Sequence, residues 1–492
     1  MSASNIDSLS YILPELVLVA TILAVFVADL LVRTKTRIGE LALVGTAISL
    51  LATTQLVGTS SGWLFGRMVV NDPFALFFKI LFALAALAAV WMSLGSKEIA
   101  ATSQGEYYGL LLSSTLGMYF MASASNLVMA YLSLEFVSLT SYVLSGYLRH
   151  DRRSGEAALK YLIYGGVASG TMIYGMSWLF GLAGGMGFDQ IHAAVTQGTP
   201  HTLALFLAMV LTLAGFGFKI AAVPFHMWAP DVYTGAPIPI TAFLSVGSKA
   251  AGFALLLRVF YPTLSIPGGD GTWQAAPGVE WPQLLLVVSM VTMTLGNLSA
   301  LWQRNLKRLL AYSSIAHAGY MLIGFVVLTD EGLRALLFYA LMYYLMNVGA
   351  FVVVMIVANA TGREDIDAFR GLAWRGGAGP AVAMAIFLFS LTGLPPFAGF
   401  VGKFFLFAAA IHREFYVLAV VGVLNSVISL AYYVRVVRTM FLDFPEGGEA
   451  TVTVGVHNGV LLWGLCAAVI VFGLYWAPVI ALADRSVRFF MG

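Results

Sequence analysis

The stretch that decides the fold is residues 215–256, GFGFKIAAVPFHMWAPDVYTGAPIPITAFLSVGSKAAGFALL. It contains two apolar runs, each with a lysine inside it, on either side of a proline-containing break. A lysine at the centre of a transmembrane helix costs about 2.5 to 3.5 kcal/mol on insertion scales, so such residues are rare and usually functional. The stretch therefore predicts membrane helices, one of them broken, whose lysines serve a function.

The composition of the whole chain agrees with this interpretation. Of its 492 residues, 60% are hydrophobic and 10% are charged, whereas a soluble domain carries roughly 25% charged residues. A transmembrane helix needs roughly 20 mainly apolar residues, and this criterion predicts an all-α integral membrane protein with about 14 spans. The spans are expected near residues 11–32, 39–58, 74–95, 107–123, 126–148, 157–183, 202–223, 238–260, 283–302, 309–328, 335–358, 380–410, 414–440 and 458–482.

The scattered charges and the single thiol exclude several function classes. The net charge is +2 and there is no basic stripe, which argues against nucleic-acid binding. The only cysteine, Cys466, supplies neither a disulfide nor an iron–sulfur cluster, and there is no motif typical of a metal or haem site. The N-terminus lacks the basic residue of a signal peptide, so we expect the first span to be retained. Any electron transfer is expected to take place in other chains.

The distribution of Lys and Arg predicts the orientation in the membrane. About 15 of them fall on one side and about six on the other, so the richer side is expected to be cytoplasmic and both termini periplasmic, in a bacterial-type inner membrane. The cytoplasmic group is Arg33, Lys35, Arg37, Lys97, Arg149, Arg152, Arg153, Arg304, Lys307, Arg308, Arg363, Arg370, Arg375, Arg435 and Arg438. The other group is Arg67, Arg258, Arg334, Arg413, Arg485 and Arg488.

Two pairs of matching features indicate an internal inverted repeat. The segments NLVMAYLSLE (126–135) and NLKRLLAYSS (305–314) share an AYxS core about 180 residues apart, in spans that cross in opposite directions. The seventh span is broken near Pro224 and the twelfth near Pro395, again oppositely directed. We therefore expect three N-terminal spans in 1–106, five-helix repeats in 107–260 and 283–440, and a last span in 441–492. Broken helices at matching places point to an ion pathway, although proline also kinks helices that only pack.

Charged residues inside the spans are the candidate functional groups. Glu135, Lys219, Lys249 and Lys403 lie in mid-span or beside a break, where an ammonium exchanges protons and a carboxylate holds them, so they predict a proton relay. Opposite charges on neighbouring helices relieve each other's cost of burial, so Glu135 and Lys219 are expected to form an ion pair whose making and breaking gates proton loading.

Four further residues have less decisive positions. Lys79, near the start of its span, either snorkels to the interface or serves the relay. Lys160 either snorkels or leads protons towards Glu135. His226, just after the first break, and His317, in the tenth span, are expected to pass protons between lysines through water.

Residues 215–256, with SLEFVSLTSYVLSGY (133–147), EAALKYLIYGG (156–166) and GLPPFAGFVGKF (393–404), resemble the antiporter-like subunits of NADH:quinone oxidoreductase, respiratory complex I. The forms MWAPDVYTGAP (227–237) and SVGSKAAGF (245–253) are most similar to its N-type branch. The resemblance implies 14 helices, two inverted half-channels and a midplane line of charged residues, with Glu135 on the fifth helix, Lys219 on the broken seventh, Lys249 as connecting lysine and Lys403 on the broken twelfth.

The resemblance also implies the function and the partners. The chain would pump protons, driven by quinone reduction in other subunits that hold FMN, iron–sulfur clusters and quinone, and it would contact neighbouring antiporter-like and small membrane subunits. A subunit of a Mrp-type cation/proton antiporter is the alternative, and a non-pumping scaffold is a third. Lys403 argues against the antiporter, because the resemblance implies glutamate there in related chains, and the four buried charges argue against the scaffold.

Overall fold

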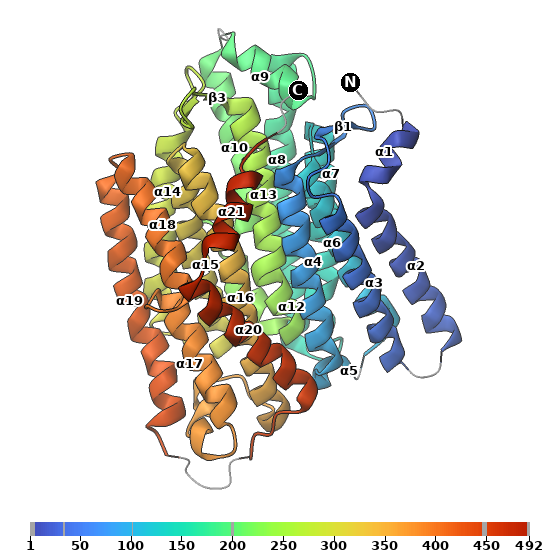
Figure 1. Ribbon diagram of the computed structural model, residues 1–492, viewed down its shortest axis with the longest axis vertical. Coiled ribbons are helices and arrows are strands. Elements are labelled where there is room, and N and C mark those ends of the chain that lie inside the picture. The colour runs from blue at the N-terminus through green and yellow to red at the C-terminus, as the bar shows by residue number, and fades with distance from the viewer. Residues whose placement is uncertain (1–4, 33–34, 101, 198–200, 445–449, 490–492) are drawn as a thin grey trace.

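The computed structural model describes residues 5–32, 35–100, 102–197, 201–444 and 450–489. Long helices run along one axis of the molecule, and short helices and hairpins lie at its ends (Figure 1). Within these described residues the expected all-α class holds, except for four strands of three residues each. Arg33, which we assigned to the cytoplasmic group, lies outside the described residues.

The N-terminal part is a group of helices on one flank of the bundle. Asp72 begins its third long helix: its side chain accepts a hydrogen bond from the Ala75 N–H, and Pro73 occupies the first helical position. A hairpin of β1 (Gly62–Leu64) and β2 (Val69–Asn71) precedes that helix. The helices are α1 Asn5–Tyr11, α2 Leu13–Leu31, α3 Thr36–Gln55, α4 Pro73–Leu94 and α5 Lys97–Ala100.

The next part contains the first broken span. Here α10 ends at Ile220, where Ala221 adopts a left-handed conformation with φ +57°, and α11 begins only at Trp228. The elements are α6 Gln104–Ser123, α7 Leu127–Ser145, α8 Arg152–Ala183, α9 Phe188–Thr196, α10 Thr202–Ile220, α11 Trp228–Gly235, α12 Ile238–Phe243, the π-helix η1 Leu244–Ser248 and α13 Lys249–Leu264.

A second hairpin, β3 (Ser265–Pro267) with β4 (Trp273–Ala275), leads to the part with the other break. There α17 ends at Thr392, and α18 begins at Ala398 after a loop that contains Pro395 and Pro396. The elements are α14 Trp281–Ala300, α15 Leu306–Val326, α16 Asp330–Thr361, the 3-10 helices η2 Ile366–Phe369 and η3 Leu372–Trp374, α17 Ala378–Thr392, α18 Ala398–His412, α19 Tyr416–Phe441, and finally α20 Val456–Leu474 and α21 Ala477–Ser486.

The centre of the bundle is formed by α16, α15 and the continuous run from α12 to α13. The α12–α13 run is buried along almost its whole length, and α16 packs against α12, α15, α17, α18, α20 and α21. By contrast, less than half of the apolar stretch of each of α2, α19 and α20 is buried, and each helix carries exposed large apolar side chains. Outer helices with apolar exposed faces are what a lipid environment requires.

Every span expected from the sequence overlaps a helix, and both predicted breaks occur where the prolines placed them. Among the described residues, 11 helices are long and apolar enough to cross a membrane, or 12 if the bent pair η2–η3 with α17 counts as one span. The chain is therefore a multi-span membrane protein, and the count of 14 stays a prediction.

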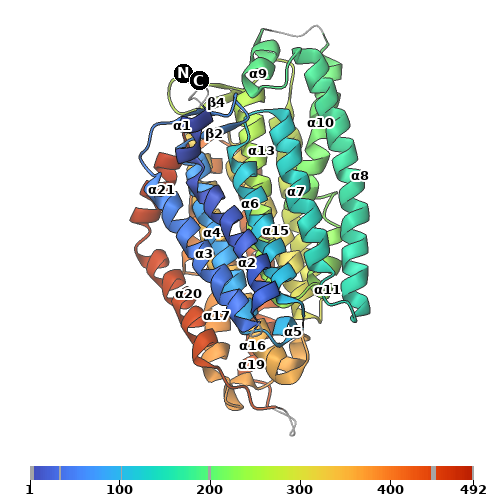
Figure 2. The same cartoon turned by 90° about the vertical axis from the view of Figure 1, so that its right-hand side faces the viewer.

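The loops rich in Lys and Arg gather at one end of the bundle, which we call the basic end. It carries α5, the loops after α7 and α14, and η2 and η3, whereas α1, α9 and both hairpins lie towards the opposite end (Figures 1 and 2).

Candidate functional site

The first broken helix brings Lys219 against α7. Lys219 lies in the last turn of α10 with 1% of its surface exposed, and its Nζ donates a hydrogen bond to Ser138 Oγ at 3.2 Å. Ser138 follows Glu135 on α7 by three residues, so both side chains leave the helix on one face. The structure thus brings Lys219 and Glu135 to the same place, as expected.

The direct ion pair between these two residues, however, is not present. Glu135 is half-buried, and its Oε1 is inaccessible to solvent and has no hydrogen-bond partner within the described part of the chain. The ammonium of Lys219 instead contacts Ser138, which lies about one helical turn further along α7 than Glu135. The expected Glu135–Lys219 ion pair is therefore open in this conformation, and the gating role of its making and breaking stays a prediction.

Lys249 lies at the junction of η1 and α13, in the most buried part of the bundle. Its exposed fraction is 2%, and its Nζ donates a hydrogen bond of 2.6 Å to the carbonyl oxygen of Ser314 on α15. The aliphatic stem of Lys219 packs against Gly252, where a Cβ atom would lie 3.1 Å from Lys219 Cγ. Because Gly252 follows Lys249 by about one turn of α13, the stem of Lys219 packs against α13 close to Lys249.

One face of α15 continues from Lys249 towards the second break. Ser314, His317 and Tyr320 follow one another at intervals of three residues and are buried. His317 Nδ1 is 2.6 Å from the hydroxyl of Tyr339, and its Nε2 is 3.5 Å from that of Tyr433. His317 therefore lies between Lys249 and the second break, and its role in passing protons between lysines stays a prediction.

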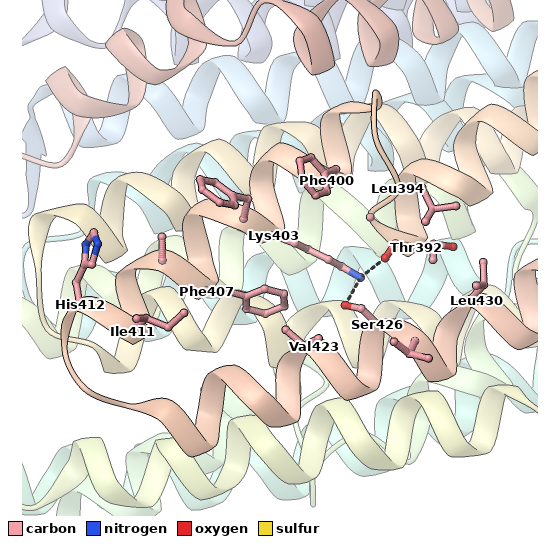
Figure 3. Close-up of a pocket in the computed structure, with 14 residues that line it drawn as sticks. Thr392, Leu394, Phe400, Lys403, Phe407, Ile411, His412, Val423, Ser426 and Leu430 are labelled. Carbon is pink, nitrogen blue, oxygen red and sulfur yellow. Dashed lines mark hydrogen bonds between the residues drawn. The ribbon is translucent and has the colours of Figure 1, made fainter.

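Lys403 lies in α18 directly after the second break. Its Nζ donates hydrogen bonds to the Thr392 carbonyl oxygen at 2.9 Å and to Ser426 Oγ at 3.1 Å, and Ser426 Oγ donates to the Tyr320 hydroxyl at 3.3 Å. Figure 3 shows the ammonium between Thr392 and Ser426, at the edge of a cavity of about 450 Å³ that Phe400 helps to line.

These residues form a row of polar groups through the bundle, and most of them are buried. Hydrogen bonds, single helical turns or packed lysine stems join its successive members. We call this set the polar row: Glu135, Ser138, Lys219, Lys249, Ser314, His317, Tyr320, Ser426 and Lys403.

Lys160 and His226 lie outside the polar row. Lys160 is 38% exposed and pairs with Glu156 and Asp231, each at 2.6 Å, and Arg308 also pairs with Asp231. His226 lies in the turn after the first break with 8% of its surface exposed, and its buried Nδ1 has no partner among the residues described.

The snorkelling interpretation of Lys79 is wrong. Its side chain is 2% exposed and forms a 2.6 Å ion pair with Glu15 of α2, which is 3% exposed. Sequence reasoning did not single out Glu15, although a carboxylate directly after Pro14 in the first apolar run was the available signal. The pair joins α4 to α2, away from both breaks.

Another buried ion pair was missed at the end opposite to the basic end. Arg258 donates to both carboxylate oxygens of Asp72, at 2.6 and 2.7 Å, and both side chains are almost fully buried. Arg258, which we assigned to the group opposite the cytoplasmic one, lies within α13. The Asp72–Pro73 start of α4 was the signal for the capping role of Asp72, whereas nothing local indicated Arg258 as its partner.

No group of three or more His, Cys, Asp or Glu side chains is placed to hold a metal ion in the parts of the chain that the structure describes. The buried polar groups of the polar row are ammonium, hydroxyl, imidazole and carboxylate groups. Such groups accept and donate protons.

Comparison of the sequence with known protein families identifies the family of this chain. Residues 124–429 match the family described as NADH:quinone oxidoreductase/Mrp antiporter, TM. The chain belongs to this family. The match includes every member of the polar row and both breaks.

Full-length relatives narrow the likeness to one branch of the family. The chain is 47% identical to NADH-quinone oxidoreductase subunit N of Anaeromyxobacter sp. (strain Fw109-5), over 99% of this chain and 98% of the relative. It is 46% identical to NADH-quinone oxidoreductase subunit N 2 of Sorangium cellulosum (strain So ce56), over 98% of each. The resemblance to the N-type branch is therefore confirmed.

Solved structures agree with these relatives. A chain of respiratory complex I from Thermus thermophilus with bound aureothin superposes with a TM-score of 0.79 at 30% identity, covering 96% of this chain and all of that one. A chain of the Mrp complex from Dietzia sp. DQ12-45-1b superposes with a TM-score of 0.83 at 20% identity, which shows a shared fold alone.

Proposed function

We propose that this antiporter-like family member is the N-type membrane subunit of a complex I and moves protons through the polar row while partner subunits reduce quinone. The observation that carries this proposal is the row of polar groups that extends from Lys219 to Lys403 by way of Lys249 and one face of α15. A buried ammonium group loses and regains its proton as the surrounding charge changes.

Each predicted residue has a role in this proposal. Lys160, in contact with Asp231, leads protons from the basic end towards Glu135 and Lys219. His226 serves the first break, Lys249 connects the two halves, His317 bridges Lys249 and Lys403, and Lys403 delivers the proton at the second break. Hydroxyl groups on Ser138, Ser426 and Tyr320 complete the transfer route.

We further propose 14 membrane helices with two inverted five-helix repeats, in residues 107–260 and 283–440. Matching ends of helices support this. Asn126 and Asn305, about 180 residues apart, each cap a helix through the side chain. The helices α8 and α16 are each 32 residues long, and each ends at a glycine with φ +69° and ψ +11°. The remaining parts are three spans in 1–106 and one in 441–492.

The proposed setting is a bacterial-type inner membrane with the basic end in the cytoplasm and both termini in the periplasm. The excess of Lys and Arg at the basic end supports this orientation. The proposed partners are neighbouring antiporter-like and small membrane subunits, and the FMN, iron–sulfur clusters and quinone belong to other chains of the complex.

The experiment that tests the function replaces the two charged groups of the first half. In whole complex reconstituted into proteoliposomes, Lys219→Ala and Glu135→Gln are expected to lower both quinone reduction and coupled proton uptake while assembly survives. Glu135→Asp should do much less harm, because it retains the charge. Normal rates and normal proton uptake in both Lys219→Ala and Glu135→Gln would remove these residues from the pathway.

A Mrp-type cation/proton antiporter remains the alternative function. This alternative is supported by the fold that the chain shares, at 20% identity, with a chain of the Mrp complex. The higher identity to full-length N subunits favours the complex I proposal.

A further inference from the structure

A polar cavity of about 530 Å³ opens at the basic end, away from the polar row. It lies between α5, the start of α8, the start of α12 and the loop after α16. The charged residues that line it are Lys97, Glu98, Arg153, Arg363, Glu364 and Asp365. Of these, Glu98 has no oppositely charged side chain within ion-pair distance among the described residues.

Glu98 instead bonds to the backbone of a distant segment. Its Oε2 accepts a hydrogen bond of 3.0 Å from the N–H of Ile238, the first residue of α12. On the other side of the same segment, Lys307 Nζ donates to the carbonyl oxygen of Ala236 at 2.7 Å and pairs with Glu364 at 2.9 Å. Two charged side chains from α5 and α15 thus hold the linker 236–238 between α11 and α12.

The linker leads directly to the central lysine of the polar row. From Ile238 the chain continues without interruption through α12 and η1 to Lys249 at the start of α13, a wholly buried helical run. Ile238 and Lys249 are therefore joined by a continuous buried helical path of roughly 16 Å, which passes through the π-helical segment η1.

A second connection runs through side chains. Thr241 Oγ1 donates to the carbonyl oxygens of Ala236 and Tyr233. The Tyr233 hydroxyl is 3.4 Å from Ser314 Oγ, and Ser314 is the residue whose carbonyl oxygen holds Lys249. The linker and Lys249 are therefore joined both along the helix and across to α15.

We propose that Glu98 is a positioning residue for proton transfer at Lys249: its carboxylate clamps the linker 236–238, and protonation of Glu98 from the basic end releases the clamp. This inference rests on the proposed proton-pumping function. A charged acceptor binds an N–H roughly twice as strongly as a neutral one, so protonation weakens the bond to Ile238.

The surroundings of Glu98 give the direction of its pH response. Burial raises the pKa of Glu98 above its ordinary value, and Glu364 also raises it, while Lys307, the Ile238 N–H and Arg153 lower it. Lys97, Arg363 and Asp365 also face the cavity. Because the pKa is raised, the carboxylate form and its clamp are present at high pH and are lost as the pH falls through the raised pKa.

The test follows the Ile238 amide by hydrogen exchange in the whole complex, alongside quinone reduction, across the acid side of neutral pH. The protection factor, which is the intrinsic exchange rate divided by the observed rate, corrects for the pH dependence of exchange itself. In the wild type, the protection factor of the segment 236–243 should fall about fivefold as the pH is lowered, and turnover should fall with it. Glu98→Gln keeps an acceptor oxygen but does not titrate, so both pH responses should disappear. Glu98→Asp keeps a titratable group and should retain them.

Glu106→Gln is the matched control, because Glu106 lies at the same end, is 56% exposed and pairs with Arg149. An unchanged pH response of Ile238 protection and turnover in Glu98→Gln would overturn the clamp, whether or not the chain pumps. Normal pumping after loss of Lys249 would instead remove the proposed function, since exchange at Ile238 is measured independently of proton transport.

Discussion

Lys403 depends on a glycine for its position. Gly393 has φ +92°, a conformation that side chains other than glycine rarely adopt, and a Cβ atom on it would lie 2.9 Å from Lys403 Cδ. The same residue therefore ends α17 and leaves space for the lysine stem. The sequence predicted the break and the lysine, but the dependence of one on the other is a tertiary contact that no local pattern contains.

We expect Gly393→Ala to displace Lys403 from Thr392 and Ser426 and to lower coupled proton uptake at least about tenfold, because a misplaced transfer group loses its partners. Proton uptake per quinone reduced in proteoliposomes measures this. Gly464→Ala is the control, since Gly464 is exposed in α20 with no atom within 4 Å of an added Cβ. Equal loss in both variants would mean that Gly393 has no special role.

The Glu15–Lys79 pair shows that considering buried lysines alone overlooks their carboxylate partners. A buried charge without a partner costs far more than a buried pair replaced by apolar residues. Hydropathy identified both helices, but the pairing of α2 with α4 depends on packing.

Lys79→Met should therefore destabilise the chain by about 3 to 5 kcal/mol by leaving Glu15 unpaired, whereas the double variant Glu15→Leu with Lys79→Met should recover most of that loss. The measurement is the fraction of complex recovered intact from membranes after graded heating. A double variant as unstable as the sum of both single variants would contradict the argument.

At the scale of elements, α15 contributes more to the polar row than any other helix. Its buried Ser314, His317 and Tyr320 connect Lys249 to the Ser426–Lys403 contact. From the sequence, His317 was expected to act through water. The structure adds the hydroxyl groups of Tyr339 and Tyr433, which lie on α16 and α19 and reach His317 only after the helices pack.

His317→Phe should keep the ring volume and remove both nitrogen atoms. Since a positioned acid–base group typically contributes a hundredfold or more to proton transfer, we expect proton uptake to fall at least about tenfold while the complex still assembles. His150→Phe, in an exposed loop, is the matched control. Unchanged uptake in His317→Phe would exclude the imidazole from the route.

Much of the fold was predictable at this scale, and less of the site. Apolar runs predicted where helices lie and prolines predicted the breaks, because both are local properties of the chain. The lysines of the polar row were visible because charge in an apolar run is costly. Their partners, such as Ser138 and Ser426, were not, because serines are frequent in these spans and only packing selects which of them contact a lysine. The clamp on Ile238 was equally hidden, since Glu98 lies 140 residues away.

At the scale of the whole molecule, charge is unevenly divided between the two ends of the bundle. Basic loops gather with α5, η2 and η3, while the hairpins lie towards the opposite end (Figure 1). The positive-inside bias is the basis on which we propose that the basic end faces the cytoplasm.

Reporter fusions inserted in the 149–156 and 363–376 loops should accordingly report a cytoplasmic position. A fusion in the 267–273 segment, in the hairpin of β3 and β4, should report the periplasm. A periplasmic signal from either of the first two loops would overturn both the orientation and the helix count.

The most direct test of the central claim, that the polar row carries protons, is the number of protons translocated per quinone reduced by whole complex in proteoliposomes when Lys249 is replaced by methionine. Lys35→Met is the control, because Lys35 is an exposed lysine paired with Asp29 at the basic end. We expect Lys249→Met to lower both turnover and proton translocation while Lys35→Met leaves both unchanged. An unaltered rate and an unaltered proton-to-quinone ratio in Lys249→Met would contradict the account.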